Sequence, residues 1–183
     1  MNYKCLRDNN FSNGEFNLVP IRGKDRYLIM QWRNDQTYHL RQSKQLTATD
    51  QDSYFSNVVS KLFTEDHPSQ LLFSYLHHEN CIGYGGLVRI DWKNRHAEIS
   101  FIMDTSLEKD QFEFHWKTYL ALIEEVAFRQ INLHKIYTHA YDLRPRLYDA
   151  LEESGYRCEA RLLEHCYFGE KFIDVVVHAK VVK

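Results

Sequence analysis

The stretch from Ala97 to Phe128 contains the groups best placed to bind an anion. A short apolar segment leads through a polar turn into a long helical pattern, where Asp110 and Glu113 have the spacing of a capping box. A strand that ends at the open N-terminus of a helix leaves unpaired N–H groups and the positive end of the helix dipole. Such an arrangement binds phosphate groups. The pattern therefore predicts a site for a phosphorylated cofactor.

The sequence argues against several other chemistries. It contains no G-x-S-x-G elbow and no P-loop, so a hydrolase or a nucleotide-hydrolysing enzyme is not indicated. His77 and His78 are adjacent on a predicted strand and should point to opposite faces, as should His165 and Cys166, so we expect no metal site. The four cysteines are widely spaced, which predicts reduced, structural thiols.

Composition indicates one globular domain over residues 1–183, with a loose polar lead-in at 1–15. Hydrophobic residues make up 44% of the chain, enough for a sizeable core. The formal net charge of −2 provides no basic field for nucleic acid or an anionic membrane. Since no apolar run has the length of a membrane span and the start lacks a signal-peptide pattern, we expect a cytoplasmic protein.

The spacing of apolar residues predicts the elements that position Ala97 to Phe128. Three- and four-residue steps predict helices at 26–35, 49–63, 112–128 and 144–155, the second capped by Thr49 or Asp50 and the last ended by Gly155. Alternation predicts strands at 16–21, 70–79, 81–92, 96–103, 134–141, 156–168 and 171–181. The longest predicted helix has an apolar stripe of Phe112, Trp116, Tyr119, Leu120, Ile123, Val126 and Ala127.

This order, β-α-α-β-β-β-α-β-α-β-β, resembles the Gcn5-related N-acetyltransferase (GNAT) family from about residue 16 to 181. The strings IGYGGL and AEISF resemble the third and fourth strands of the family, and LHKIYTHAY with ALEESGY resembles its fifth strand and L-Y-E-K-L-G-F segment. Trp32-Arg33-Asn34 matches the W-R-N of the ribosomal-protein and nucleotide-amino-sugar acetyltransferase branch. The resemblance implies an α/β (α+β) fold, with a mixed, mostly antiparallel twisted sheet of about seven strands and about four flanking helices.

The resemblance also implies acetyl-CoA as co-substrate, without a metal. The strand at 96–103 would splay from the strand at 134–141, and the pantetheine arm would bond the backbone at Phe101, Ile102 and Met103. The pyrophosphate signature Q/R-x-x-G-x-G/A aligns with 111–116, where both glycines are missing and bulky side chains should narrow the site. The helix residues expected at the cofactor are Gln111, Phe114, His115, Trp116 and Lys117, with Lys109 as a further donor.

For catalysis, the resemblance points to Glu98 as the base that accepts the amine proton through water. The alternative is an ordinary exposed carboxylate on an alternating strand. The tyrosine that protonates the thiolate in many family members aligns with Leu151 here, so Tyr148 and Tyr141 are the substitutes. Either tyrosine would otherwise serve in packing.

The segment after the first helix is expected to cover the acceptor, by resemblance to the family. Its aromatic and amide groups suit a sugar or a base ring, and its arginine suits a phosphate. We therefore expect a monomer or homodimer that acetylates a primary amine of a small molecule, possibly a nucleotide-linked amino sugar. Alternatives are a protein N-terminal amine, a different acyl donor, or a binding protein that has lost catalysis. The expected acceptor residues are Trp32, Asn34, Tyr38, His39, Arg41 and Gln42.

Overall fold

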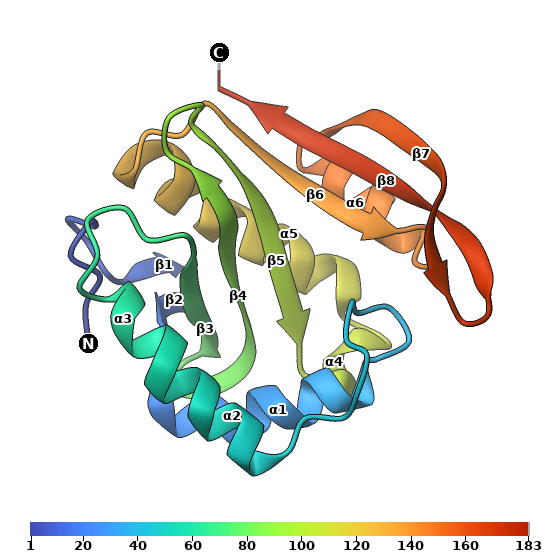
Figure 1. The fold of residues 1–183 in the computed structure, drawn as a ribbon. Helices are drawn as coiled ribbons and strands as arrows, with labels where there is room; N and C mark the ends of the chain where they lie inside the picture. Colours follow the sequence, from blue (N-terminus) through green and yellow to red (C-terminus); the bar gives the residue numbers. More distant parts are fainter. Residues whose placement is uncertain (183) are drawn as a thin grey trace.

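The computed structural model describes residues 1–182, which form one mixed sheet of eight strands. The strands lie in the spatial order β1-β2-β3-β4-β5-β6-β8-β7 (Figure 1). Every neighbouring pair is antiparallel except β5 and β6, which are parallel. The strands are β1 (Phe11–Asn13), β2 (Phe16–Pro20), β3 (Leu71–His77), β4 (Asn80–Asp91), β5 (His96–Met103), β6 (Lys135–Tyr141), β7 (Arg157–Phe168) and β8 (Lys171–Val181).

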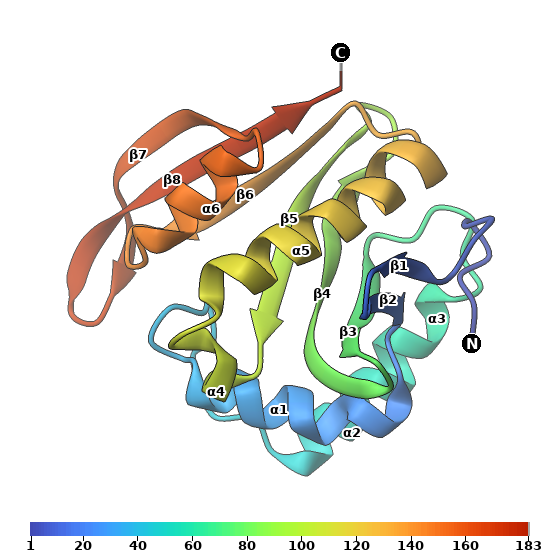
Figure 2. The same ribbon diagram turned by 180° about the vertical axis from the view of Figure 1, so that it is seen from behind.

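Helices cover both faces of this sheet. One face carries α1 (Arg26–Asp35) and a continuous helical segment made of α2 (Ala48–Tyr54), the π-helix η2 (Phe55–Val59) and α3 (Ser60–Leu62) (Figure 1). The opposite face carries α5 (Phe112–Glu124), its π-helical continuation η3 (Glu125–Gln130) and α6 (Arg146–Glu153) (Figure 2). The short helices are η1 (Gly23–Asp25) and α4 (Thr105–Glu108). The predicted mixed fold and element order are confirmed, with eight strands in place of about seven.

The N-terminal residues pack on the sheet, so the prediction of a loose lead-in at 1–15 is wrong. Phe11–Asn13 pairs with β2 as the edge strand. Tyr3 is buried, and its hydroxyl donates to the carbonyl of Leu72 at 2.7 Å and accepts from the N–H of Leu72 at 2.8 Å. Its ring stacks on Phe63 with centroids 4.6 Å apart. Because this stretch is mostly polar, the burial of Tyr3, Leu6 and Phe11 was not predicted.

Two predicted helix starts are corrected by the structure. α5 begins after Gln111 and no side chain caps its first turn, so the capping box of Asp110 and Glu113 does not form. α2 begins one residue earlier than predicted, because Thr47 and Asp50 form a capping box in which each side chain accepts from the other residue's backbone N–H. None of the helices in residues 1–182 is long and apolar enough to cross a membrane.

The apolar stripe of α5 and η3 packs on the centre of the sheet as predicted, and all seven of its members are buried. Tyr119 stacks on Phe101 of β5 with ring centroids 3.9 Å apart, and its hydroxyl donates to the carbonyl of Ser100 at 3.0 Å. A Cβ at Gly85 of β4 would lie 2.6 Å from the Tyr119 hydroxyl and 2.1 Å from the Ser100 carbonyl oxygen. The missing side chain at Gly85 therefore allows α5 to approach the sheet closely.

Candidate functional site

β5 and β6 diverge after a short paired segment. Only His96, Ala97 and Glu98 of β5 pair with β6, although the two strands continue to Met103 and Tyr141. The predicted splay is therefore present, and Figure 1 shows the two ribbons separating toward α4. Beyond Glu98, the side of β5 that faces β6 has no strand partner. Backbone groups left in this way bond a ligand or water.

A cavity of about 500 Å³ lies where the strands diverge. This volume is within the usual range for a small-molecule site. One end is lined by Trp116 and Leu147, which belong to the helices on the α5 face. The other end is lined by residues of α1 and the following loop, so the cavity connects the two faces of the sheet. Its strand residues are Val88, Arg89, Glu98, Ile99, Ser100, Phe101, Ile102, Thr138, His139, Ala140 and Tyr141.

Among the described residues 1–182, Glu98 is the only carboxylate that lines this cavity. It is 7% exposed, and each of its oxygens accepts from a different arginine. Arg41 donates to Oε1 at 3.0 Å and Arg89 donates to Oε2 at 2.9 Å. Arg41 also donates to the backbone carbonyl of His139, so its guanidinium bridges β5 and β6 across their divergence. The two ion pairs fix the position of the carboxylate in the cavity.

Arg89 reaches Glu98 through a bulge in β4. The register between β4 and β5 shifts between Val88 and Asp91, and Arg89 adopts a φ of 51°. A side-chain-bearing residue in the left-handed region costs on the order of 1 kcal/mol. Bulges next to active sites commonly redirect a side chain in this way. The sequence pattern of an alternating strand gave no sign of this geometry.

Arg33 lines the same cavity from α1, and the hydrogen bonds of its guanidinium go to neutral groups. Nη1 donates to the Tyr84 hydroxyl at 2.6 Å and Nε donates to Gln42 Oε1 at 3.1 Å. Gln42 in turn donates to Asn34, whose side chain also holds the backbone of Leu46. Asn34 and Gln42, predicted at the acceptor, therefore organise the loop after α1 and do not line the cavity.

The pantetheine prediction falls on a part of the cavity that has unpaired polar groups. Phe101 and Ile102 line it, while the carbonyl of Met103 accepts from Gln36 at 2.8 Å and is already occupied. Opposite them on β6, the buried Thr138 hydroxyl lines the cavity without a hydrogen-bond partner. An amide-bearing arm between the strands would satisfy Thr138 and the free edge of β5.

A second, shallower hollow lies at the start of α5, where the pyrophosphate was predicted. Its lining includes Gln111, Phe114 and Lys117 as expected, together with Lys109 and Arg146. Phe114 is 53% exposed. The first turn of α5 has no side-chain cap, so its N–H groups can face an anion here beside Lys109. Lys117 already pairs with Glu153 and Arg146 with Glu108, and the lining also includes the carboxylates of Asp110 and Glu113. His115 and Trp116 are instead buried under the sheet, with Trp116 reaching the first cavity.

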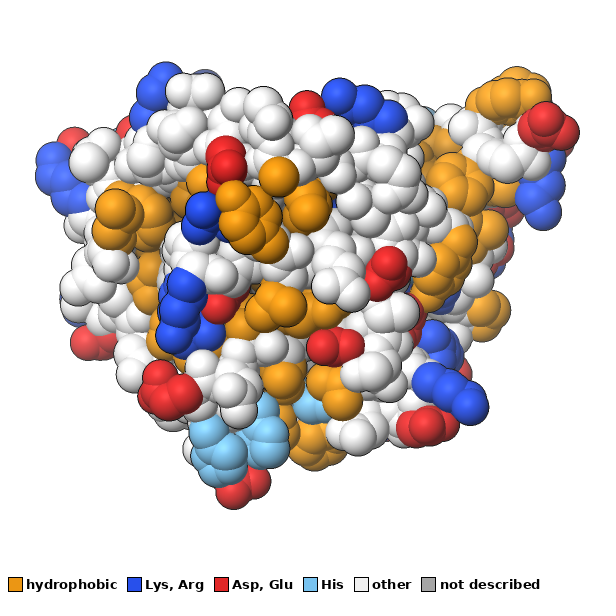
Figure 3. Space-filling model, turned by 90° about the horizontal axis from the view of Figure 1, so that it is seen from below, with side chains coloured by type: hydrophobic (Ala, Val, Ile, Leu, Met, Phe, Trp, Pro, Cys, Tyr) orange, Lys and Arg blue, Asp and Glu red, His pale blue; other side chains and the backbone are white. Residues whose placement is uncertain are grey.

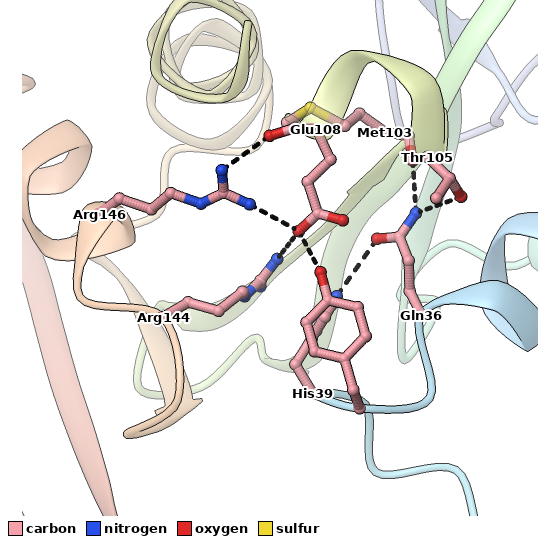
Figure 4. Close-up of polar contacts among 8 residues, drawn as sticks. Gln36, His39, Met103, Thr105, Glu108, Arg144 and Arg146 are labelled. Carbon is pink, nitrogen blue, oxygen red and sulfur yellow. Dashed lines mark hydrogen bonds and ion pairs between the residues drawn. The ribbon is translucent and has the colours of Figure 1, made fainter. Parts of the chain in front are cut away.

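A buried carboxylate separates the two hollows. Glu108 of α4 accepts from Tyr38 at 2.6 Å, from Arg144 at 3.2 Å and from Arg146 at 3.3 Å, all at one oxygen (Figure 4). Arg144 lines the cavity, and Arg146 lines the hollow at α5. Burial lowers the pKa of Arg144 in spite of the neighbouring carboxylate. Tyr38 therefore belongs to this cluster and does not line the cavity.

His39 lies beside the same cluster. Burial, with the positive charges of Arg144 and Arg146, lowers the pKa of His39 to about 3, so the ring is neutral at ordinary pH. Its Nε2 lies 3.2 Å from Oε1 of Gln36, which links the loop after α1 to the end of β5 (Figure 4). His39 lines the cavity as a neutral group. Trp32, the remaining acceptor candidate, is buried in the core.

The two candidate acids differ in position. Tyr141 lines the cavity, and burial raises the pKa of its hydroxyl. Tyr148 does not line the cavity, since its hydroxyl donates to Asp142 at 2.7 Å and its ring stacks on His178. Burial, followed by the Asp142 carboxylate, raises the pKa of Tyr148. Tyr141 is therefore the better-placed donor.

Several residues that line the cavity were not predicted from the sequence. Arg33 stood within the W-R-N string, but only its neighbours were chosen, and Arg89 was visible only as a charged residue in an apolar strand. Nothing in the sequence marked the hydroxyl of Thr138 or the ring of His139.

The adjacent histidines were also mispredicted. His77 and His78 do not point to opposite faces, because His78 has a φ of 52° and the two rings stack with centroids 4.5 Å apart. Their Nε2 atoms each lie 3.5 Å from an oxygen of Glu15. Figure 3 shows histidine side chains gathered beside an acidic group on the lower surface. The ligand atoms of this trio are close enough to hold a metal ion, and none of the three lines the cavity.

Comparisons with known proteins identify a family and a set of similar structures. Residues 18–177 match the family described as acetyltransferase (GNAT) domain. Spermidine N(1)-acetyltransferase of Vibrio cholerae is 29% identical over 97 residues, which is 53% of this chain and about half, 54%, of that protein. The crystal structure of spermidine N-acetyltransferase from Vibrio cholerae in complex with CoA and spermine superposes with a TM-score of 0.81 at 20% identity, covering 92% of this chain and 96% of that one.

These relatives do not support the narrower prediction of a ribosomal-protein or nucleotide-amino-sugar branch. The matches are to spermidine acetyltransferases, so the amino sugar loses its basis as an acceptor. A dodecameric structure of the Vibrio cholerae enzyme superposes with a TM-score of 0.74 at 20% identity, covering 92% of this chain and 95% of that one. For this chain, a monomer or homodimer remains a prediction.

Proposed function

Because the chain belongs to the acetyltransferase (GNAT) family, as the sequence predicted, we propose that it transfers the acetyl group of acetyl-CoA directly to a primary amine of a small molecule. The family match over residues 18–177 supports the enzyme class of this proposal, an N-acetyltransferase that uses acetyl-CoA as co-substrate. The acceptor and the residues that act on it are parts of the proposal.

One observation carries the proposal. The cavity between β5 and β6 connects the two faces of the sheet, with the free edge of β5 and the unpaired Thr138 hydroxyl inside it. Two substrates can therefore meet in the cavity from opposite faces. The residues that would hold the cofactor are Phe101, Ile102 and Thr138 at its arm and Gln111, Lys117 and Arg146 at its phosphates.

Acetyl-CoA supplies an acetyl group that is activated as a thioester. Transfer to nitrogen also requires an unprotonated amine and a group that accepts its proton. Glu98 is placed to orient the amine and to accept the proton through water, while Tyr141 is placed to donate a proton to the departing thiolate. Because both oxygens of Glu98 are held by arginines, a water relay suits it better than direct contact.

The test is a titration followed by an activity assay. Acetyl-CoA and desulfo-CoA should raise the melting temperature in a concentration-dependent manner, since both bind the folded state. A thiol-release assay with a panel of primary amines should then show turnover. A melting temperature that does not change at millimolar concentrations of either ligand would overturn the proposal.

The names of the relatives make a polyamine the first acceptor to include in that panel. Spermidine and spermine are the amines associated with the Vibrio cholerae proteins. The cavity of this chain is lined by more arginines than carboxylates, which favours an acceptor that carries negative charge.

A further inference from the structure

We propose that the acceptor is a primary amine that also carries an anionic group, which Arg33, Arg41 and Arg89 bind while Glu98 faces the amine. This inference rests on the proposed function and specifies its substrate class. It comes from the charges that line the cavity between β5 and β6.

The cavity is basic in a chain whose net charge is −2. Four arginines line it, against the single carboxylate of Glu98. His39 and His139 do not offset the charge of the arginines, because burial is the main cause that lowers their pKa values and favours the neutral rings. Arg144 is the one of the four that is neutralised elsewhere, by Glu108. Three arginines thus share one carboxylate on the acceptor side.

Arg33 is the most informative of the three. Its side chain is half-buried and its guanidinium bonds only Tyr84 and Gln42, both neutral, and within residues 1–182 it forms no ion pair. A cation that is partly withdrawn from water without a counter-ion loses hydration free energy, and an anionic ligand offsets that loss. Guanidinium groups also have the geometry to bind carboxylate and phosphate oxygens in pairs.

Arg41 and Arg89 each use one nitrogen to hold Glu98 and keep further N–H donors. An acceptor anion on these donors would place its amine near the Glu98 carboxylate. A polyamine would instead bring several positive charges to one carboxylate that two guanidinium groups already neutralise. The same residues that attract an anionic amine therefore repel a polycation.

Matched pairs of acceptors test this assignment. O-phosphoethanolamine is compared with ethanolamine, and β-alanine with β-alaninamide, so that each pair shares an amine and differs in the anion; spermidine is the polycation. Binding is measured by calorimetry with the full-length protein, and turnover by thiol release from acetyl-CoA. We expect at least one anionic amine to bind about tenfold or more tightly than its neutral partner.

Variants locate the effect. Arg41→Gln and Arg33→Gln should each reduce the preference for the anionic member of a pair about tenfold, and Arg33→Lys should restore part of it. Arg129→Gln, at an exposed position on η3 outside the cavity, should leave the preference unchanged. A melting curve for each variant excludes unfolding as the cause of a loss.

The outcomes separate the two proposals. Turnover of spermidine with a kcat/KM equal to or above that of every anionic amine overturns the inference while the proposed function stands. Equal binding of anionic and neutral partners also overturns it. Selective binding of an anionic amine without turnover supports the inference and counts against catalysis.

Discussion

At the scale of single residues, each carboxylate oxygen of Glu98 accepts a hydrogen bond from an arginine. Replacing Glu98 with glutamine removes the negative charge and keeps a side chain of the same size. Glu98→Gln should bind acetyl-CoA within about twofold of the parent and lower kcat by about 10²-fold or more, because an amide cannot accept the amine proton. Calorimetry and initial rates measure the two effects. Glu65→Gln, at an exposed position outside both hollows, is the matched control, and an unchanged kcat in Glu98→Gln would remove Glu98 from the mechanism.

His39 makes stability depend on pH. Its pKa of about 3 in the folded protein lies below the ordinary value of 6.5, so the unfolded chain takes up the proton first as pH falls. The neutral His39 therefore contributes fully to the free energy of unfolding above about pH 6.5, and this contribution is lost as the pH falls toward 3. Between about pH 7 and about pH 5.5, His39→Gln should lose about 1 kcal/mol less free energy of unfolding than the parent. Urea titrations measure this, with the exposed His134→Gln as control; identical pH slopes would contradict it.

Some cavity residues could be predicted from their chemistry alone. Those whose position in the cavity depends on contacts between distant parts of the chain could not. Glu98 and Arg41 were chosen separately, and the structure places them in direct contact across 57 positions. Arg89 depends on a β-bulge, and Arg33 on the way a loop folds back onto α1. Such contacts depend on register and loop path, which local patterns do not encode.

At the scale of elements, the start of α5 has bulky side chains at the two positions where the family signature has glycine. Glycine at Trp116 would open a void in the core, because that ring is 3% exposed and packs edge-on against Phe101. Phe114 is half exposed and lines the hollow, so it can be changed without that loss. Helix periodicity predicted the buried stripe correctly but could not separate these two aromatics by role.

Phe114→Ala should tighten CoA binding about threefold or more, since a smaller side chain lets the pyrophosphate approach the N–H groups of the first turn. Binding of pantetheine, which lacks the pyrophosphate, should not change. Isothermal titration of both ligands measures the difference, and Phe172→Ala, an exposed aromatic on β8, is the control. Equal affinities of parent and variant for CoA would place the pyrophosphate elsewhere.

At the scale of the whole molecule, the order of strands and helices along the chain was predicted correctly, while the edge of the sheet was not. Strand alternation and helical spacing could be read from the sequence because each depends on local periodicity. The edge strand is β1, and Tyr3 anchors the segment that precedes it by bonding Leu72 of β3, 69 positions away. A single tyrosine in a polar segment carries no local signal of such a contact.

Tyr3→Phe should lower the free energy of unfolding by about 1–3 kcal/mol, because the variant leaves the N–H of Leu72 without its acceptor in a buried place. Urea unfolding measures this change. Tyr27→Phe, which removes an exposed hydroxyl bonded to Asp52, should cost less than about 0.5 kcal/mol. Equal effects in the two variants would show that the Tyr3 hydroxyl is not a structural link.

Because β5 pairs with β6 over only a short segment, we expect backbone amides in the middle of the sheet to exchange with solvent deuterium. Only three residue pairs join the two half-sheets, so amides on the free edge of β5 beyond Glu98 should exchange sooner than those of β3 and β4, which are bonded on both sides. A bound pantetheine arm would slow the exchange there and on the facing part of β6, and would leave the exchange of β3 unchanged. Mass spectrometry of exchanged peptides can therefore map the cofactor without any knowledge of the acceptor.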